Sequence, residues 1–439
     1  MPSIPPGPGP SRVLNTWRFQ TRPTTFLESA RERYGDVWML RLVGHTDFVV
    51  VSDPKLIEEV FTADPTVLHT GSGTGKPVMG PRSAIIVNED EHEEMRRLLN
   101  PLFRGESVQR YNNLTAEIAE RKLAEWPLNE ERPILPLMHS ITMTVIMSAV
   151  FGVTEADRQE ALKERIDTLI EWGSGAARMA KMHRSQRLGK PAPKSLAVAR
   201  DPLDEMCYDI IERAKEDPGL EERDDMLALL IKARYEGERP LTDRELRDHL
   251  VTLLIQGHAS TGDALSWALE RLMRNPDVYE RLREEVRSNG DDYVDAVAKE
   301  TLRMRPPLGI CTRLVNKPFK LADWELEPGQ LIAPCIYLVH HDPRIYPDPE
   351  KFEPERFLGT KPGKYTWIPF GGGYRSCLGG FFAVHEIKTV LRVIAQQARF
   401  EPATDEDDPV RLRRVGMSPK HGARAKLVER VSATGVAAS

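Results

Sequence analysis

One cysteine of this sequence lies among residues whose types and spacing suit the binding of a flat cofactor. Cys377 sits in the string Phe-Gly-Gly-Gly-Tyr-Arg-Ser-Cys-Leu-Gly-Gly, which spans residues 370–380. Glycine permits left-handed backbone and a close approach to a bulky group. Apolar residues at three- and four-residue spacing follow, so we expect a helix to begin just after Cys377, where its dipole and free amides favour a thiolate. A thiolate held by glycine-rich backbone is an arrangement that ligates haem iron.

The alternative for Cys377 is a buried, inert thiol on a glycine-rich turn, which is the usual state of a free cysteine. The other three cysteines, Cys207, Cys311 and Cys335, lie far apart and form no CxxC pair. Neither a disulfide framework nor a zinc site is therefore indicated.

The string around Cys377 resembles the haem-binding loop of the cytochrome P450 superfamily, whose pattern is Phe-x-x-Gly-x-Arg-x-Cys-x-Gly. The resemblance implies that Cys377 is the axial ligand of haem b. It also implies the cytochrome P450 fold, a mainly α-helical (α+β) protein with a small β lobe and one long central helix over the haem. The residues that match the pattern, and that are expected to contact the cofactor, are Phe370, Gly373, Arg375, Cys377 and Gly379.

A second motif supports the resemblance. His92 and Arg96 are four residues apart on a helix that is expected to start at Asn88, so both side chains project from one face. On its own, such a pair indicates a solvated, charged face. The family has a His-x-x-x-Arg at this place whose side chains bind the haem propionates, and the resemblance gives Arg313 the same role.

The longest helical pattern opens with a capping box at residues 242–245 and runs to about Met273. Its centre changes from apolar to small and polar residues, which indicates close helix packing or a kink. The resemblance places this centre on the distal face of the haem, where the family has an acid followed by threonine. Ala259 replaces the acid and Ser260 the threonine, so we expect altered proton delivery, with Asp263 as a substitute through water. The catalytic candidates are Gly257, Ala259, Ser260 and Thr261.

The resemblance also identifies a structural triad. Glu300 and Arg303 are three residues apart, and a surface pair of that kind contributes only ~0.2–0.5 kcal/mol. Arg356 follows in Phe-Glu-Pro-Glu-Arg-Phe, and in the family these three residues lock the scaffold of the haem loop. Breaking a buried charge pair costs ~3–5 kcal/mol. The residues expected to line the substrate pocket are Leu254, His258, Leu308, Gly309 and Ile310.

The composition is that of a soluble globular protein. The 439 residues are 40% hydrophobic and 29% charged, with a net charge of −5, which argues against nucleic-acid binding. The first residues contain no apolar run typical of a signal peptide, and nowhere do about 18 apolar residues run together, so we expect no transmembrane anchor. The resemblance implies a cytoplasmic location. We expect a proline-rich segment over residues 1–23, a single haem domain over residues 24–430 and a polar tail over residues 431–439.

The function implied by the resemblance is that of a monooxygenase. It would insert one oxygen atom from O2 into a hydrophobic small molecule, such as a fatty acid, terpenoid, steroid or polyketide. The sequence has no flavin or iron–sulfur motif, so electrons are expected from a separate ferredoxin or flavodoxin with an NAD(P)H-dependent reductase. The cations Arg96, Arg97, Arg104 and Lys364 would form the docking site. We expect a monomer.

Two other functions stay open at this point. Ala259 favours a haem-thiolate enzyme that uses peroxide, or one that catalyses a rearrangement or dehydration. A non-catalytic haem sensor or electron carrier is the other alternative, and for that role the long pocket-forming segments have no obvious purpose.

Three further stretches that suggest binding sites are better explained as loops. Residues 71–76 lack the first glycine of a phosphate-binding loop, and Pro77 follows the lysine. Residues 178–200 carry seven Lys and Arg and no acid, and are expected to form a mobile, solvated lid between two helices, with an anionic substrate or lipid surface as the minority interpretation. His340 and His341 are adjacent in an expected turn, and adjacent histidines seldom share a metal.

Overall fold

The computed structural model describes residues 5–71, 73–103, 106–152, 156–235, 239–413 and 416–431. Arg104 and almost all of the expected polar tail lie outside these residues. The α-helices are α1 (Arg12–Thr21), α2 (Pro23–Tyr34), α3 (Pro54–Thr62), α4 (Lys76–Met79), α5 (Glu89–Leu99), α6 (Glu106–Ala124), α7 (Leu135–Phe151), α8 (Ala156–Ser174), α9 (Ala176–Arg187), α10 (Lys194–Glu216), α11 (Met226–Lys232), α12 (Asp243–Gly257), α13 (Ala259–Arg274), α14 (Pro276–Arg287), α15 (Asp292–Met304), α16 (Ile336–His340) and α17 (Gly380–Gln397). The strands are β1 (Val37–Leu40), β2 (Phe48–Val51), β3 (Leu68–Thr70), β4 (Glu131–Pro133), β5 (Arg313–Val315), β6 (Phe319–Leu321), β7 (Trp324–Leu326), β8 (Leu331–Pro334), β9 (Ala398–Pro402), β10 (Val410–Arg413), β11 (Gly416–Pro419) and β12 (Arg424–Arg430). Short 3-10 helices are η1 (Gly73–Gly75), η2 (Asn100–Phe103), η3 (Pro354–Phe357) and η4 (Gly373–Arg375).

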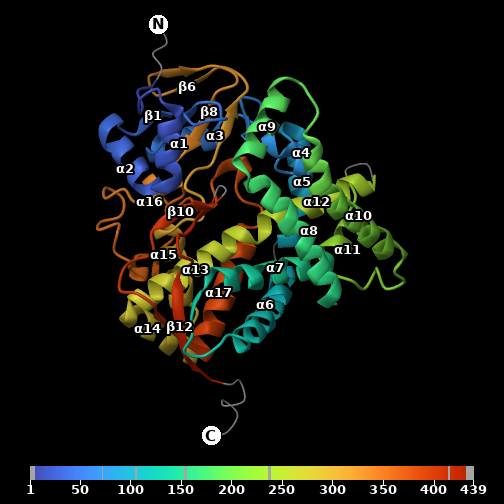
Figure 1. The fold of residues 1–439 in the computed structure, drawn as a ribbon, viewed down its shortest axis with the longest axis vertical. Helices are drawn as coiled ribbons and strands as arrows, with labels where there is room; N and C mark the ends of the chain where they lie inside the picture. Colours follow the sequence, from blue (N-terminus) through green and yellow to red (C-terminus); the bar gives the residue numbers. More distant parts are fainter. Residues whose placement is uncertain are drawn as a thin grey trace.

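A five-stranded sheet forms the β lobe, with the strand order β1-β2-β8-β5-β3. β1 and β2 are an antiparallel hairpin, whereas β8 runs parallel to β2 and pairs Leu331 with Phe48. Successive side chains of a strand point to opposite faces, so Val49 packs in the cluster that contains α3, while Val50 packs in the cluster that contains α2. Figure 1 shows this lobe with α1, α2 and α3 at one end of the molecule, away from α6, α7 and α8.

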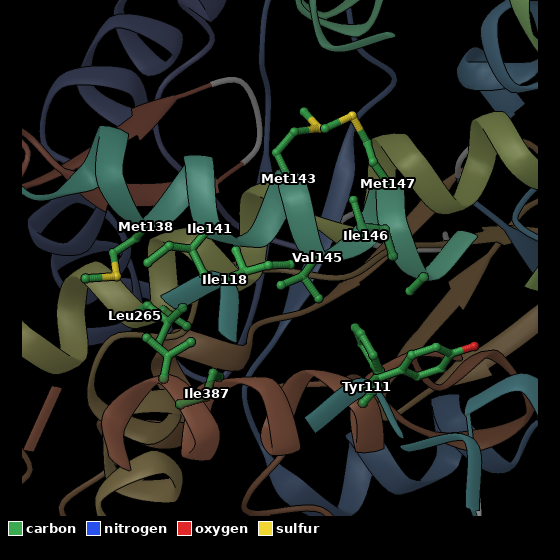
Figure 2. Packing of buried hydrophobic residues seen from close by; sticks show 14 of the residues in the cluster. Tyr111, Ile118, Met138, Ile141, Met143, Val145, Ile146, Met147, Leu265 and Ile387 are labelled. Carbon is green, nitrogen blue, oxygen red and sulfur yellow. The ribbon is translucent and has the colours of Figure 1, made fainter. Parts of the chain in front are cut away.

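The helical body is built around α7. This helix is apolar on every side, and such a helix is stable only when other elements cover it completely. Figure 2 shows Met138 and Ile141 of α7 packed near Leu265 of α13 and Ile387 of α17. Tyr111 of α6 belongs to the same buried cluster. α7 therefore fixes the positions of the helices that carry the distal residues and the helix that follows Cys377.

The sequence predicted either close packing or a kink at the centre of the long helix. The structure shows both at this place. This helix opens with the predicted capping box, in which Thr242 and Glu245 satisfy each other's backbone N–H groups. The helix is then interrupted at His258, which separates α12 from α13. A Cβ atom on Gly257 would lie 2.8 Å from the side chain of Ile146, and a Cβ on Gly262 would lie 2.3 Å from the ring of His139. The small residues allow α7 to contact the central helix directly.

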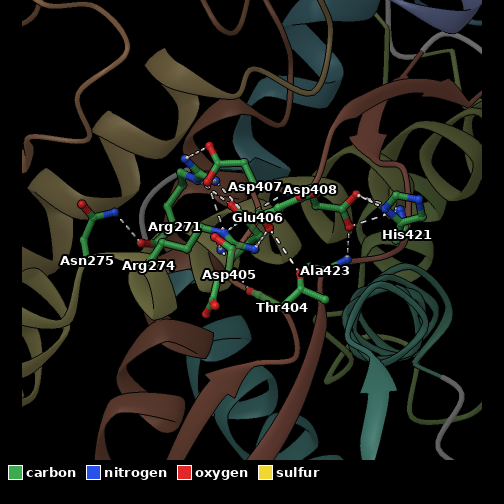
Figure 3. A network of polar contacts seen from close by, with 11 residues as sticks. Arg271, Arg274, Asn275, Thr404, Asp405, Glu406, Asp407, Asp408, His421 and Ala423 are labelled. Carbon is green, nitrogen blue, oxygen red and sulfur yellow. Dashed lines mark hydrogen bonds and ion pairs between the residues drawn. The ribbon is translucent and has the colours of Figure 1, made fainter.

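The far end of α13 is fixed by a network of polar contacts with the segment before β10 (Figure 3). Arg271 donates to the carboxylate of Asp407 at 3.0 Å, and Arg274 donates to the carbonyl oxygen of Asp405 at 2.9 Å. Asp408 in turn accepts a hydrogen bond from the backbone N–H of Ala423 at 2.8 Å. This network fixes the C-terminal end of the distal helix against the C-terminal strands.

Several local expectations need correction. Residues 71–76 are not a plain loop, because η1 and the start of α4 lie there. Most of the basic stretch 178–200 is helical, in α9 and the start of α10, because alanine and long straight side chains favour helix. Only the centre of that stretch, which contains Pro191 and Pro193, forms a connection. His340 is the last residue of α16 rather than part of a turn.

One further expectation was correct in part. Asn88 does precede α5, yet its side chain makes no capping bond to that helix. The amide oxygen of Asn88 instead accepts hydrogen bonds from Thr70 N at 2.9 Å and from Arg375 at 2.6 Å. The Asn88 side chain thus supports the candidate cofactor loop.

Candidate active site

Two backbone hydrogen bonds close the loop around Cys377, one across the whole loop and one across a tight turn. The backbone N–H of Cys377 donates to the carbonyl oxygen of Phe370 at 2.9 Å, and that of Ser376 donates to Gly373 at 3.1 Å. α17 begins at Gly380, so the predicted helix start just after the cysteine is confirmed. The loop presents Cys377 at the N-terminal end of a long, buried helix.

Gly373 is required by the packing of the β lobe against this loop. Its φ is 69°, in the left-handed region that side chains other than glycine's rarely adopt. A Cβ atom on Gly373 would lie 2.0 Å from the carbonyl oxygen of Phe61, at the end of α3. α3 therefore supports the loop from behind through a backbone contact that leaves no room for a side chain.

The surroundings of the Cys377 sulfur raise the pKa of its thiol, whereas the sequence predicted a helix start that favours the thiolate. Cys377 is exposed at the surface of the chain, whereas Cys207 and Cys335 are buried. Protein atoms still crowd the sulfur, and this desolvation raises the pKa of the Cys377 thiol, although the Gly379 N–H and the charge of Arg96 act to lower it. A coordinating metal cation favours the thiolate, because it deprotonates the thiol that binds it.

Four predicted propionate-binding or loop residues do gather at one place. His92 is buried on α5, and its pKa is lowered to about 3 by desolvation and by the positive charges of Arg375, Arg96 and Arg313. Such an effect requires all three guanidinium groups to lie close to the imidazole. His92 is consequently a neutral hydrogen-bonding group within a strongly positive cluster.

This cluster fits a cofactor with carboxylate groups. Arg313 donates to the carbonyl oxygens of Thr312 and Gly372, both at 3.0 Å, so its acceptors are neutral. Arg375 donates to Ala84 O at 3.2 Å and to neighbouring oxygens, and its Nε is buried without a hydrogen-bond partner among the residues that the structure describes. No carboxylate within the described ranges pairs with either arginine. Buried cations that lack anions are the setting that the two propionates of haem would complete.

The distal residues lie on a partly open segment of the central helix, residues 255–260, which we call the open stripe. Most of α12 and α13 is buried, whereas Gly257, Ala259 and Ser260 are half-buried and Gln256 is exposed. Thr261 is buried. This stripe brings Ala259 and Ser260 to an accessible surface, where a distal ligand could meet them.

His258 and Leu254 point into the protein at this level. The Nδ1 of His258 contacts the carbonyl oxygen of Leu254 at 2.8 Å, and its ring makes an edge contact with His139 on α7, at a centroid distance of 6.4 Å. Leu254 belongs to the main hydrophobic core. Among the other residues expected in the pocket, Leu308 is exposed, Ile310 is half-buried and Gly309 is buried.

Asp263 has a partner that the sequence did not indicate. Its Oδ1 lies 3.0 Å from the Nε2 of His139, and the carboxylate is almost completely buried. The side chain of His139 keeps about a third of its surface exposed, at 34%. Asp263 is thus connected through an imidazole on α7 toward solvent, rather than being an isolated carboxylate on the distal helix.

The predicted triad is assembled as a buried charge cluster. Glu300 and Arg303 are completely buried, with Arg303 donating to the two carboxylate oxygens at 2.7 and 2.9 Å. Arg356 lies 3.6 Å from the same carboxylate. The backbone N–H of Glu353 adds a third hydrogen bond to Glu300, at 2.9 Å. Charge and hydrogen bonding together hold η3 against α15.

His340 connects this triad to the Cys377 loop, and sequence reasoning missed it. Arg303 donates to the carbonyl oxygen of His340 at 2.9 Å, and the imidazole Nε2 accepts the backbone N–H of Ile368 at 2.8 Å. Ile368 lies just before the glycines of the loop. Burial and the charge of Arg303 lower the pKa of His340 to about 3, so its ring stays neutral and able to accept. No motif in the sequence indicates this contact.

The family model described as Cytochrome P450 matches residues 4–424. This chain belongs to the cytochrome P450 family. Two similar proteins of Mycobacterium tuberculosis are "Putative cytochrome P450 135B1", 35% identical over 432 residues that cover 97% of this P450 and 91% of the relative, and "Putative cytochrome P450 138", 34% identical over 400 residues that cover 91% and 90%.

Solved structures agree with the fold. "Retinoic acid bound cyanobacterial CYP120A1" is 25% identical, covers 98% of this P450 and 100% of that chain, and superposes with a TM-score of 0.84. "Crystal structure of cytochrome P450DA heme domain" is 20% identical, with a TM-score of 0.83 and 98% coverage of each chain. The predicted mainly α-helical P450 fold with a β lobe is confirmed.

Family membership confirms the cofactor and the general chemistry. This P450 binds haem b and is a haem-thiolate oxidoreductase of the monooxygenase type. None of the helices in the described ranges has the length and apolar character needed to cross a bilayer.

Proposed function

We propose that this P450 inserts one oxygen atom from O2 into a hydrophobic small molecule, with Cys377 as the ligand of the haem iron. The observation that carries the proposal is the gathering of Arg96, Arg313, Arg375 and neutral His92 beside the Cys377 loop, with no carboxylate paired to Arg313 or Arg375 within the described ranges. With a thiolate ligand, haem supplies O–O cleavage and oxygen transfer to C–H bonds.

The residues of this chain have distinct roles in that proposal. The guanidinium groups of Arg313 and Arg375 would give charge-assisted hydrogen bonds to the propionates. His92, being neutral, would donate a hydrogen bond without adding charge. Arg96 donates to the carbonyl oxygen of Ser376 at 2.9 Å and so also fixes the turn that presents the cysteine.

On the distal side, the Ser260 hydroxyl holds the proton that the reaction needs. It stands on the open stripe of the central helix. Ala259 beside it cannot hold a proton, and serine lacks the β-methyl group that fixes the rotamer of threonine. Proton transfer from the protein is therefore expected to be the weak part of this site.

A hydrophobic substrate is supported by the residues around the site and by one neighbour. Leu308 is exposed and Ile310 half-buried beside the β5 strand. The structural neighbour CYP120A1 has been solved with retinoic acid bound, which is a largely apolar molecule. Fatty acids, terpenoids, steroids and polyketides all fit this class.

Electrons come, in this proposal, from a separate ferredoxin or flavodoxin and an NAD(P)H-dependent reductase. Arg97 and Lys364 are exposed cations that suit an acidic partner, although Arg97 also pairs with Glu93 at 2.7 Å. Arg96 is half-buried, which suits a role in the loop better than one in docking.

The iron ligand is tested by the absorbance of the reduced, carbon-monoxide-bound protein. The wild type should show the strongly red-shifted Soret band of thiolate ligation, and Cys377→Ala should lose it. Cys311→Ala is a matched control, because the Cys311 sulfur lies 3.9 Å from the position of a Cβ on Gly371 in the same loop. Retention of the band in Cys377→Ala would exclude this ligand.

A second candidate function is the use of peroxide in place of O2 and reductase. Ala259 and the engagement of Asp263 with His139 favour it, because both leave the distal stripe short of acids. Product formed with reductase and NAD(P)H, compared with product formed from added hydrogen peroxide on the same substrate, separates the two functions. Turnover only with peroxide would contradict the O2-dependent proposal.

A further inference from the structure

A cavity of about 440 Å³ lies between α4, α10 and the first half of α12, lined by a different set of residues from the Cys377 loop. Its wall includes the Gly80–Pro81 turn and Tyr208. Positive charge predominates among its ionised groups by four to two. The cations are Lys76, Arg200, Arg244 and Arg247, and the acids are Asp204 and Asp248.

The two acids are already committed to protein donors. Asp204 lies 2.8 Å from the Nε of Arg247 and 3.2 Å from the Nε of Arg200. Asp248 accepts from Arg247 at 3.0 Å and from the backbone N–H of Arg82 at 3.0 Å. Arg200 and Arg247 pair with both acids of the lining, and Arg200 also pairs with Asp201, outside the lining, at 2.8 Å. No carboxylate in the lining is therefore left for the other two cations.

Three donors of the lining have no such partner. The ammonium of Lys76, the guanidinium of Arg244 and the hydroxyl of Tyr208 make no hydrogen bond or ion pair with any residue that the structure describes. Desolvation raises the pKa of Tyr208, so its hydroxyl stays protonated and can donate at neutral pH. Two uncompensated positive charges and a neutral donor thus face one cavity.

We propose that this cavity binds a small anion through a phosphate or carboxylate group, held by Lys76, Arg244 and Tyr208. The side chains of Lys76, Arg244 and Tyr208 are exposed to solvent, but positive charge on a concave wall attracts anions more strongly than the same charge on a flat surface. Ammonium and guanidinium groups form the short, charge-assisted bonds that phosphate and carboxylate oxygens accept. The site is separate from the proposed oxidation and does not depend on it.

Occupancy of this cavity would connect three elements near the distal helix. Arg247 already reaches Val78 on α4, at 3.0 Å from its carbonyl oxygen, as well as Asp204 on α10. Lys76 belongs to α4 and Arg244 to α12. An anion held by both residues would add a direct link between α4 and α12. Binding is therefore expected to reduce hydrogen exchange of the backbone over α4.

The test is isothermal titration of the haem-loaded full chain in phosphate-free buffer of low ionic strength. Inorganic phosphate, acetate and decanoate are titrated separately. At least one should bind, and Lys76→Ala/Arg244→Ala should weaken that binding by about tenfold or more, since two charge-assisted bonds are lost. Tyr208→Phe should weaken it less. The matched control Arg18→Ala/Lys361→Ala removes two cations that are exposed and lie elsewhere, and should bind as the wild type does.

The pattern of binding identifies the source of the anionic group. Binding of phosphate that is lost in the double variant supports a free phosphate or phosphate ester. Binding of decanoate alone, with the same loss, supports the carboxylate of an amphiphilic molecule. If none of the three anions binds at millimolar concentration, or if the double variant binds as the wild type does, the proposal is wrong. An unchanged carbon-monoxide spectrum in the variants keeps this result separate from the assignment of Cys377.

Discussion

Removing the carboxylate of Glu300 should weaken the whole scaffold of the Cys377 loop. Glu300→Ala takes away both hydrogen bonds from Arg303 and the acceptor of Glu353 N, and it leaves Arg356 without its buried partner. Loss of one member of a buried ion pair costs ~3–5 kcal/mol, and an unsatisfied buried N–H costs a further ~1–3 kcal/mol. Arg303 retains only carbonyl acceptors, such as His340 O.

We therefore expect the free energy of unfolding to fall by about 4 kcal/mol or more, a large share of the ~5–15 kcal/mol that ordinary domains possess. Urea titration followed by circular dichroism and by haem absorbance measures the loss, together with the haem content of the purified protein. Glu300→Gln keeps the volume and one acceptor, so it should lose less. Glu93→Ala, which breaks only the exposed pair with Arg97, should cost ~0.3–0.5 kcal/mol.

One outcome would refute this reasoning. If Glu300→Ala contains a full complement of haem and unfolds at the same urea concentration as Glu93→Ala, the buried cluster does not stabilise the loop. The haem-absorbance transition is the more specific measurement, because His340 transmits the loss to Ile368 at the start of the loop.

Three further predictions concern the site. Gly373→Ala should abolish most haem incorporation, because its Cβ would clash with the Phe61 carbonyl. The control Gly359→Ala, at a similar positive φ with no atom within 4 Å, should retain haem. Equal haem content in the two variants would contradict the packing argument. Ala259→Asp should raise the product formed per NAD(P)H consumed, and Ser260→Ala should lower it, since positioned proton transfer contributes ~10²–10⁴-fold to the reaction rate. Tight coupling that survives Ser260→Ala would show that protons arrive by another route. Because the pKa of His340 is lowered to about 3, the unfolded chain binds a proton below pH ~6.5 that the folded chain does not, so stability is complete above that pH and falls by ~1.4 kcal/mol per unit as the pH decreases. His340→Gln should reduce that slope in urea titrations at several pH values, and an unchanged slope would be inconsistent with a neutral, buried His340.

The parts that the sequence predicted well are those in which local spacing determines structure. The capping box at Thr242, the helix after Cys377 and the Glu300–Arg303 pair on one helix face all depend on residues within a few positions of each other. In these three cases the covalent chain itself limits the possible neighbours. The small residues at Gly257 also indicated close packing, but the sequence did not show that the partner is Ile146 of α7.

The features that could not be predicted from the sequence depend on contacts between distant segments. Asn88 matches a helix cap, yet its amide serves Thr70 and Arg375 instead, and only the tertiary structure decides between these partners. The role of His340 was not predicted, because its imidazole accepts a hydrogen bond from Ile368, which lies beside it only in the folded chain. The helix start after Cys377 is visible in the sequence, whereas the desolvation that raises the pKa of its thiol comes from distant segments and is not.

The strand order of the β lobe sets the sequence of events in biosynthesis. β2 is synthesised early, but one of its two neighbours, β8, comes from the C-terminal half of the chain, and the Cys377 loop comes later still. Until β8 leaves the ribosome, one edge of β2 has no parallel partner and the apolar side chains of Val49 and Val51 lack part of their cover. Phe61 can support Gly373 only after that lobe has closed. Haem capture is therefore expected to be a late step in the folding of this chain. A cell that produces the chain faster than its unfinished β lobes are protected should accumulate aggregated apoprotein rather than soluble apoprotein awaiting haem.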